Sequence, residues 1–341
     1  MSKPSRVCIV LVNWNGWRDT IECLESVFRL DYTDFTVVVC DNDSSDDSLE
    51  RIKEWARGEL IVSPSNPTLA HLVTPSIPKP LIWADYDRAE AERGGDLAEH
   101  PPLVLIQTGA NLGFAGGNNV GFRYALARGD ADYIWALNND TVVDAGALRA
   151  LIDRMGETSG RGIVGSTLIF YAEPDRVQAF GCASYSKKIG LAAPIGCGCS
   201  IGAVPVDPTS VEKNAAYVVG ASMLVSRTFL EQVGLMCEDY FLYFEELDWA
   251  ERGRKLGFSS LYAPLSIVYH KVGAATKKTP RSKGLSVSER CSCRNRLLVT
   301  KRFFPEAQFW VKSRLALEGM KALLRGRTEE AHFVFSAILG R

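Results

Sequence analysis

The sequence predicts an α/β fold in which helices cover a single, mostly parallel sheet. Short apolar runs such as Val7–Val12 and Phe35–Cys40 are rich in branched residues and too short for helices, as is typical of buried parallel strands. Segments with helical spacing follow these runs, and polar residues stand where each run ends. Because ligands bind at the carboxyl ends of the strands in open α/β sheets, the pattern also predicts where the site lies.

The first two strand–helix units are complete by about residue 57. The run Val7–Val12 ends at Asn13, and the run Phe35–Cys40 ends at Asp41. Apolar residues at helical spacing follow each of them, at 17–28 and at 49–55. We therefore expect Asn13 and Asp41 to lie at the same edge of the sheet.

Residues 63–102 interrupt this rhythm. They hold seven of the fifteen prolines and show no sustained period, which predicts a surface insertion with at most a short exposed helix. A strand is expected again at 103–107, followed by a Gly- and Asn-rich loop at 108–119 that would let backbone N–H groups approach a diphosphate. Its glycines do not have the spacing of the dinucleotide-binding fingerprint, which argues against a dehydrogenase.

The remaining strand ends hold the candidate metal-binding residues. Residues 133–137 form an apolar run that ends abruptly in Asn138, Asn139 and Asp140. An Asp beside two amides at a strand end suits a divalent cation and the phosphate or hydroxyl groups it carries, although a plain turn is the alternative. Later strand pieces at 258–262 and 267–269 end at His270, one of four histidines; a packed histidine is the alternative there.

A second group of candidates opens a predicted helix. The segment 241–254 carries Glu245, Glu246 and Asp248 at the helix start, and residues three apart, such as Glu245 and Asp248, project together. The alternative is that these acids only complement the helix dipole. Upstream, the strand at 217–226 is broken by small residues at 220–222, which leaves room for a ligand to approach the backbone.

Charge and cysteine content exclude several classes of protein. The 39 basic residues nearly balance the 40 acidic ones, which argues against nucleic acid as the main partner. The stretch 271–302 is locally basic, with ten Lys or Arg against one acid, and predicts contact with phosphate or a membrane surface. The nine cysteines lack the Cys-x₂-Cys spacing of zinc sites, and without a signal-like start they predict free thiols in a reducing cytosol.

The end of the chain permits two interpretations. No apolar stretch approaches the roughly 20 residues that cross a bilayer, so any membrane contact is expected to be peripheral. From Glu306 onward, one helical stripe is apolar and basic residues lie outside it; the stripe consists of Trp310, Leu317, Met320 and Leu324. These helices pack on the rest of the protein, dock on anionic lipid near a lipid-linked acceptor, or do both.

Taken in order, these stretches resemble the family 2 glycosyltransferases, within them the bacterial group that includes rhamnosyltransferases of cell-surface polysaccharide assembly. The resemblance covers residues 6 to about 302; its carriers are VNWNG (12–16), VCDNDSSDDS (39–48), NLGFAGGNN (111–119), ALNNDTVVD (136–144), VVGASMLVSR (218–227), YFEELDW (243–249), VYHKVGAAT (268–276) and RNRLL (294–298). It implies the glycosyltransferase A-type fold. It also implies a catalytic domain at 1–270, a basic active-site loop and helix at 271–305, and C-terminal amphipathic helices at 306–341.

The resemblance assigns roles residue by residue. The donor-binding residues it implies are Asn13 and Asp41 for the nucleoside, Asn111, Phe114 and Asn118 for the ribose and diphosphate, and Asn138 and Asn139 beside them. Asp140 stands at the last position of the family's Asp-x-Asp motif, and His270 matches a histidine that helps hold the metal or diphosphate, so the implied cofactor is Mg²⁺ or Mn²⁺. The basic stretch would neutralise the departing diphosphate.

Two residues depart from the family's pattern. The first Asp of the metal motif is Asn138, which leaves fewer anionic ligands. The expected base, an Asp, is Glu246, whose carboxylate reaches about an ångström further. Glu245 and Asp248 therefore remain alternative bases.

The expected function is inverting, metal-dependent transfer of a hexosyl group, with rhamnose as one candidate. The donor would be a nucleoside-diphosphate sugar and the acceptor a hydroxyl of a saccharide or lipid-linked glycan. The protein would act in the cytoplasm, with peripheral contact at the inner face of the cell membrane as the alternative. The other functions considered are a catalytically weak nucleotide-sugar-binding protein and a nucleotidyltransferase. The latter would need a Gly-rich loop with Arg and Lys after the first strand, which VNWNGWRD lacks.

Overall fold

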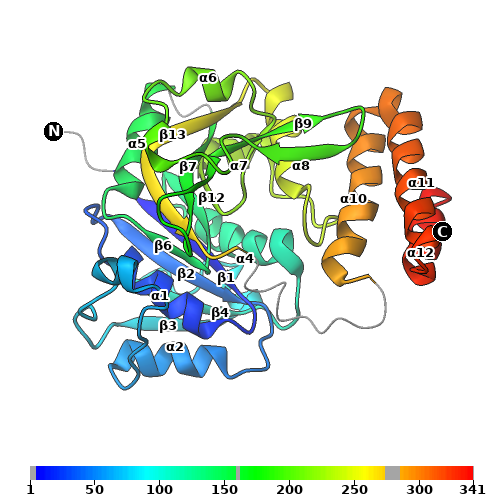
Figure 1. Ribbon diagram of the computed structural model, residues 1–341. Coiled ribbons are helices and arrows are strands. Elements are labelled where there is room, and N and C mark those ends of the chain that lie inside the picture. The colour runs from blue at the N-terminus through cyan, green and yellow to red at the C-terminus, as the bar shows by residue number, and fades with distance from the viewer. Residues whose placement is uncertain (1–4, 159–161, 273–284, 341) are drawn as a thin grey trace.

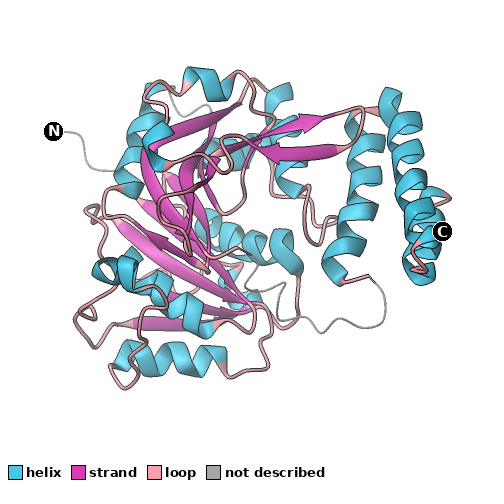
Figure 2. Cartoon of the chain, in the orientation of Figure 1, coloured by secondary structure: helices cyan, strands magenta, loops and turns pink. Residues whose placement is uncertain are grey.

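The computed structural model describes residues 5–158, 162–272 and 285–340. A large twisted sheet runs through the molecule with helices on both faces, and a small second sheet leads to three C-terminal helices at one end (Figures 1 and 2). The strands of the large sheet are β1 (Val7–Asn13), β2 (Phe35–Asp41), β3 (Trp83–Asp87), β4 (Leu103–Gln107), β5 (Tyr133–Asn138), β6 (Thr141–Val143), β7 (Gly162–Phe170), β8 (Val177–Phe180), β12 (Ser222–Ser226) and β13 (Ser259–His270). Those of the small sheet are β9 (Cys182–Ser186), β10 (Leu191–Pro194) and β11 (Tyr217–Val218).

Helices fill most of the connections. The α-helices are α1 (Trp17–Val27), α2 (Ser48–Arg57), α3 (Arg88–Ala91), α4 (Gly113–Arg128), α5 (Ala147–Glu157), α6 (Thr209–Glu212), α7 (Arg227–Val233), α8 (Glu245–Lys255), α10 (Val287–Phe303), α11 (Gln308–Leu324) and α12 (Thr328–Ile338). Short 3₁₀ turns are η1 (Pro67–Leu72), η2 (Ile201–Ala203) and η3 (Pro305–Ala307). No helix within the described ranges combines the length and apolarity that a membrane span requires.

The large sheet is mostly parallel, as the sequence predicts. Strands β3, β4, β2, β1 and β5 run parallel in that order, β12 is antiparallel between β5 and β7, and β13 is parallel to β7. The register places Asn13 opposite Asp41 and Val12 opposite Asn138. The polar ends of β1, β2 and β5 therefore meet at one edge.

The two faces of the sheet carry separate cores because successive strand residues point to opposite sides. Ile9 and Leu11 pack with residues of α1, α2 and α5, including the buried Trp55. Val10 packs on the other face with residues of α4, α7 and α8, including the buried Trp249. This burial fixes the strands whose ends form the site.

Two sequence predictions about the first half are wrong. Residues 63–102 are not only a surface insertion, because Trp83–Asp87 within them form the edge strand β3, paired in parallel with β4. Asp85 and Asp87 hide this strand from an apolar-pattern search, and such charges are common on edge strands. The predicted short helix is present as α3.

The Gly-rich segment 108–119 is only partly a loop, because α4 begins at Gly113. A side-chain Cβ at Gly117 would lie 2.7 Å from Val12 Cγ1, and one at Gly121 would lie 2.5 Å from Val10 Cγ1. These glycines therefore serve close packing of the helix on β1 rather than loop flexibility. The two strand pieces predicted before His270 are one strand, β13, with a register shift between Ala263 and Ile267.

Candidate functional site

The ends of β1 and β2 form a buried polar network. Asn13 Nδ2 donates to Asp41 Oδ2 at 2.7 Å and to Ser44 Oγ at 3.1 Å, and the Thr20 hydroxyl donates to Asn13 Oδ1 at 2.7 Å. Asn13 and Asp41 are almost fully buried. The structure thus brings together the two residues predicted for the nucleoside pocket, and adds Thr20 and Ser44, which sequence reasoning missed.

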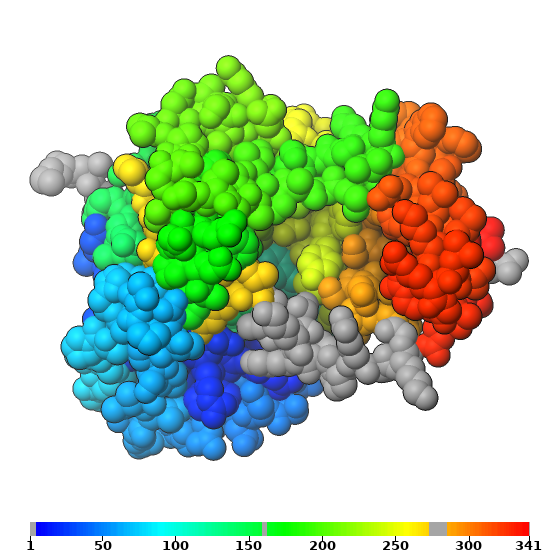
Figure 3. Space-filling model, viewed as in Figure 1, coloured from blue at the N-terminus to red at the C-terminus, as the bar shows by residue number. Residues whose placement is uncertain are grey.

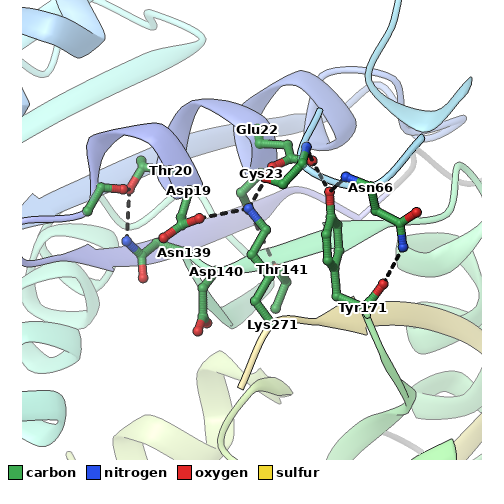
Figure 4. Close-up of polar contacts among 12 residues, drawn as sticks. Asp19, Thr20, Glu22, Cys23, Asn66, Asn139, Asp140, Thr141, Tyr171 and Lys271 are labelled. Carbon is green, nitrogen blue, oxygen red and sulfur yellow. Dashed lines mark hydrogen bonds and ion pairs between the residues drawn. The ribbon is translucent and has the colours of Figure 1, made fainter. Parts of the chain in front are cut away.

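The end of β5 sends its side chains in different directions. Asn139 Nδ2 donates to Thr20 Oγ1 at 2.9 Å, so Asn139 joins the network around Asn13. Figure 4 shows the Asp140 carboxylate directed the opposite way, away from α1. Asp140 Oδ1 lies 3.2 Å from His270 Nε2, and Asn138 Nδ2 lies 3.4 Å from the same ring nitrogen. The predicted metal-binding pair, Asp140 and His270, is therefore in contact.

His270 is oriented by Gln178, which sequence reasoning missed. Its Nδ1 lies 3.0 Å from Gln178 Oε1 on β8, and an amide oxygen only accepts, so Nδ1 carries a proton. In a neutral ring the lone pair of Nε2 then faces Asn138 Nδ2 at 3.4 Å and Asp140 Oδ1 at 3.2 Å. Nε2 and the Asp140 carboxylate thus offer lone pairs from the same side to a cation.

These donors fit a divalent cation held jointly with a substrate. Among the described residues, no group of three or more His, Cys, Asp or Glu side chains is placed to hold a metal. Asp140 and His270 would therefore supply two ligands, and Mg²⁺-type sites commonly complete their shell with water and substrate phosphate.

A buried charge cluster fixes the segment behind His270. Lys271 Nζ lies 2.7 Å from Asp19 Oδ1 and 2.6 Å from Glu22 Oε2 on α1, and Glu22 also accepts from the Tyr171 hydroxyl (Figure 4). Burial opposes the charged form of Lys271, but these carboxylates outweigh it and raise its pKa. Lys271 is thus committed to α1 rather than to a diphosphate. The basic residues expected at 277–283 lie outside the described residues.

The predicted ribose and diphosphate residues gather at the start of α4. Asn111 Oδ1 accepts from the Gly113 N–H at 3.1 Å, and Asn118 Nδ2 donates to the Phe114 carbonyl at 2.9 Å. Asn42, which directly follows Asp41, donates from Nδ2 to the Gly113 carbonyl at 2.9 Å. Asn42 thereby ties the start of α4 to the end of β2, and its position in the polar run after β2 was the signal that could have identified it.

Glu246 lies against the small-residue break between β11 and β12. The Gly220 N–H donates to Glu246 Oε1 at 3.2 Å, and the neighbouring Ala221 carbonyl accepts from the Asn138 N–H at 3.0 Å. A Cβ at Gly220 would lie 2.5 Å from Glu246 Oε1 and 3.2 Å from Phe114 Cζ. One backbone–backbone and one backbone–side-chain hydrogen bond thus connect the end of β5 to Glu246.

The other two candidate bases have different surroundings. Glu245 is 2% exposed, and burial, followed by the charge of Glu246, raises its pKa well above the usual value. Burial also raises the pKa of Glu246. Asp248 is fully buried, with Oδ1 2.7 Å from Arg252 Nε and Oδ2 2.8 Å from Arg302 Nη1. Each oxygen is thus paired with an arginine, and the pair with Arg302 joins α8 to α10.

The sequence matches one family of known proteins. The sequence profile described as Glycosyl transferase family 2 matches residues 8–70 and 85–191. The chain belongs to this family. The matched residues include every predicted donor residue and Asp140, whereas Glu246 and His270 lie beyond them.

Individual family members are similar at low identity. The low-salt glycan biosynthesis hexosyltransferase Agl10 of Haloferax volcanii is 28% identical over 156 residues, which are 46% of this chain and 48% of that protein. The N-acetylglucosaminyl-diphospho-decaprenol L-rhamnosyltransferase of Mycobacterium tuberculosis is 25% identical over 224 residues, which are 60% of this chain and 70% of that protein. The chain thus spans about half the length of Agl10.

A solved structure confirms the glycosyltransferase A-type fold. GalNAc-T7, crystallised with UDP, GalNAc and Mn²⁺, aligns with a TM-score of 0.61 at 13% identity. The alignment covers 92% of this chain and 51% of that chain. At this identity the likeness concerns the fold alone.

Proposed function

We propose that the protein transfers a hexosyl group, with rhamnose as one candidate, from a nucleoside-diphosphate sugar to a hydroxyl of a saccharide or lipid-linked acceptor. The observation that carries this proposal is that Asn138, which contacts His270, is joined to Glu246 through Ala221 and Gly220. Family membership and the hexosyl- and rhamnosyltransferase relatives support it. The glycan biosynthesis named for Agl10 favours a role in cell-surface polysaccharide assembly.

The residues at the carboxyl edge of the sheet would hold the nucleotide and a cation. Asn13, Asp41 and the start of α4 would hold the nucleotide, and Asp140 with His270 would hold a divalent cation, Mg²⁺ or Mn²⁺. When bound, such a cation neutralises charge that develops on the leaving diphosphate. GalNAc-T7, crystallised with UDP and Mn²⁺, supports the same pairing of nucleotide and cation.

Glu246 would act as the general base. It takes the proton of the acceptor hydroxyl while that oxygen bonds to the anomeric carbon, and the bond from this carbon to the diphosphate breaks with its electron pair on the diphosphate. Attack from the face opposite the leaving group inverts the configuration. The raised pKa of Glu246 suits a base whose strength is matched to neutral pH.

A donor screen tests the proposal against its two rivals. Purified protein is heated with a panel of nucleoside-diphosphate sugars and Mn²⁺, and a ligand at about 100 times its Kd should add roughly 2.7 kcal/mol of stability. The best ligand is then assayed for metal-dependent release of nucleoside diphosphate, which we expect. Binding without turnover, even with saccharide acceptors, would favour a binding protein, and pyrophosphate release from a nucleoside triphosphate would favour a nucleotidyltransferase.

We also propose that α11 docks on an anionic membrane surface. The stripe of Trp310, Leu317 and Leu324 is 58%, 50% and 88% exposed, because α11 packs on its neighbours through a different face, formed by Val311, Leu315, Gly319 and Ala322. The helix thus packs on α10 and α12 while this stripe stays exposed. Arg314 and Lys321 follow Trp310 by four and eleven residues and so lie beside the stripe, and an aromatic–aliphatic face flanked by basic residues suits anionic lipid. Figure 3 shows α11 and α12 forming one side of the molecule.

Vesicle sedimentation tests this surface. The full chain should pellet with phosphatidylglycerol vesicles and much less with phosphatidylcholine vesicles. The variant Trp310→Ser/Leu317→Ser/Leu324→Ser should stay in the supernatant, whereas the control Ile61→Ser/Ile82→Ser, at sites 77% and 72% exposed elsewhere, should behave as the wild type. Equal pelleting of both variants would contradict the proposal. If the wild type instead forms a dimer without lipid and the triple variant does not, the stripe is a contact between two copies of the chain.

A further inference from the structure

The RNRLL segment has a buried residue that reaches the turn before the candidate bases. Asn295 on α10 is 5% exposed. Its Nδ2 donates to the Leu242 carbonyl at 2.8 Å and to the Tyr243 carbonyl at 3.0 Å. Because α8 begins at Glu245, a single amide on another helix contacts the backbone that sets the direction of this helix start.

The contacted turn has an unfavourable backbone conformation. Tyr243 has φ +71° and Phe244 has φ +76°, in the left-handed region that residues other than glycine rarely adopt. Such conformations persist only where the surrounding structure holds them, and they cluster at functional sites. The Tyr243 hydroxyl also lies 2.8 Å from Ser288 Oγ on α10. Helix α10 thus contacts the strained turn at two points.

Helix α10 is itself firmly attached. Arg302 pairs with Asp248 on α8 at 2.8 Å. Arg296, 3% exposed, lies 3.1 Å from Glu318 on α11 and donates to the Ile189 carbonyl. The helix therefore offers the Asn295 amide a fixed position relative to α8.

We propose that Asn295 is a positioning residue that holds the 242–244 turn in its left-handed conformation and thereby places Glu246 against Gly220. The catalytic consequence rests on the proposed function of Glu246, whereas the effect on the turn does not. Loss of the donor leaves two carbonyls without their partner and removes the restraint on the strained residues. The turn then relaxes, and the Glu246 carboxylate moves away from its contact with the Gly220 N–H.

The test separates positioning from packing by comparing three variants. Asn295→Asp keeps the size of the side chain but an ionised carboxylate cannot donate, and Asn295→Leu removes the donor with an apolar side chain. The control is Cys293→Ala, a buried position on the same helix that faces α11 and α12. All three variants should lower the melting temperature, so the melting temperature does not distinguish positioning from packing. The two measurements that do are hydrogen–deuterium exchange of the 242–244 turn and the separate effects on kcat and on donor KM.

Hydrogen–deuterium exchange is measured first, without substrate. Both Asn295 variants should exchange faster in peptides that cover 241–247, and Cys293→Ala should not. In the transfer assay the Asn295 variants should lose about 10- to 100-fold in kcat, the scale of an ångström-sized misplacement, with donor KM within about twofold. Unchanged exchange at 241–247, or a kcat loss no larger than in Cys293→Ala, would overturn the proposal. If the wild type transfers no sugar, the proposed function fails and exchange alone decides the role of Asn295.

Discussion

Gly220 donates its backbone N–H to Glu246 Oε1 at 3.2 Å, in a position where any larger residue would collide with that carboxylate. The next residue, Ala221, accepts from the Asn138 N–H at 3.0 Å. The small-residue break between β11 and β12 is therefore the link between the end of β5 and the candidate base.

The variant Gly220→Ala should displace Glu246. Its Cβ would lie 2.5 Å from Glu246 Oε1 and 3.2 Å from Phe114 Cζ, so one of these side chains must move. We expect kcat to fall about 10- to 100-fold with little change in donor KM, because an ångström-sized displacement affects proton transfer more than binding. Steady-state kinetics with donor and acceptor measure both constants.

The matched control is Gly156→Ala near the end of α5. A Cβ there meets nothing within 4 Å, and alanine in place of a helical glycine stabilises by up to about 1 kcal/mol. Kinetics like those of the wild type are expected. A Gly220→Ala variant that is as active as this control would show that Glu246 need not occupy its present position.

The variant Asp140→Ala should lose metal-dependent turnover while the fold survives, because Asp140 stands at the end of a strand outside the two apolar cores. Circular dichroism and activity are measured on the same sample. Binding of Mn²⁺ in the presence of nucleoside diphosphate, followed by the electron paramagnetic resonance of the free ion, should weaken as well. Turnover retained at saturating Mg²⁺ or Mn²⁺ would remove Asp140 from the metal site.

Glu245 should make stability depend on pH in a defined direction. Burial raises its folded-state pKa above the unfolded value of about 4.3. The favourable contribution of its protonated form is therefore complete below that value and is lost as pH rises through the folded pKa. Glu245→Gln cannot ionise, so its melting temperature relative to the wild type should rise between pH 4 and pH 8.

The control for this titration is the exposed Glu306→Gln, which should show a flat difference over the same range. A flat difference in Glu245→Gln would mean that Glu245 ionises in the fold as easily as in the unfolded chain.

Asp248→Asn should instead destabilise at neutral pH, because it weakens two ion pairs, with Arg252 and Arg302.

The sequence was sufficient to predict which residues lie at the carboxyl edge of the sheet. Asn13 and Asp41 directly follow buried apolar runs and Asp140 stands three residues after another, and parallel strands bring such ends together. The edge strand β3 could not be placed, because its outward charges conceal the apolar pattern.

Long-range partners could not be predicted for a different reason. Lys271 contacts Asp19, 252 residues earlier, and His270 contacts Gln178, 92 residues earlier. Neither pair leaves a periodic signal in the sequence, since each is made only when β13 comes to lie beside other elements. The ion pair between Asp248 and Arg302 on α10 is a third such contact. It could not be predicted, so the sequence left Asp248 among the candidate bases.

Isosteric replacement shows whether Glu246 removes the proton from the acceptor hydroxyl. The turnover of Glu246→Gln, Glu245→Gln and Asp248→Asn is measured beside donor binding by thermal shift. Loss of a general base costs about 10² to 10⁴ in rate, so Glu246→Gln should lose this much in kcat, with donor KM and the donor-induced shift nearly unchanged. The other two variants should show smaller losses or a raised KM. A wild-type kcat in Glu246→Gln, with collapse in either neighbour, would contradict the assignment and move the catalytic role to that neighbour.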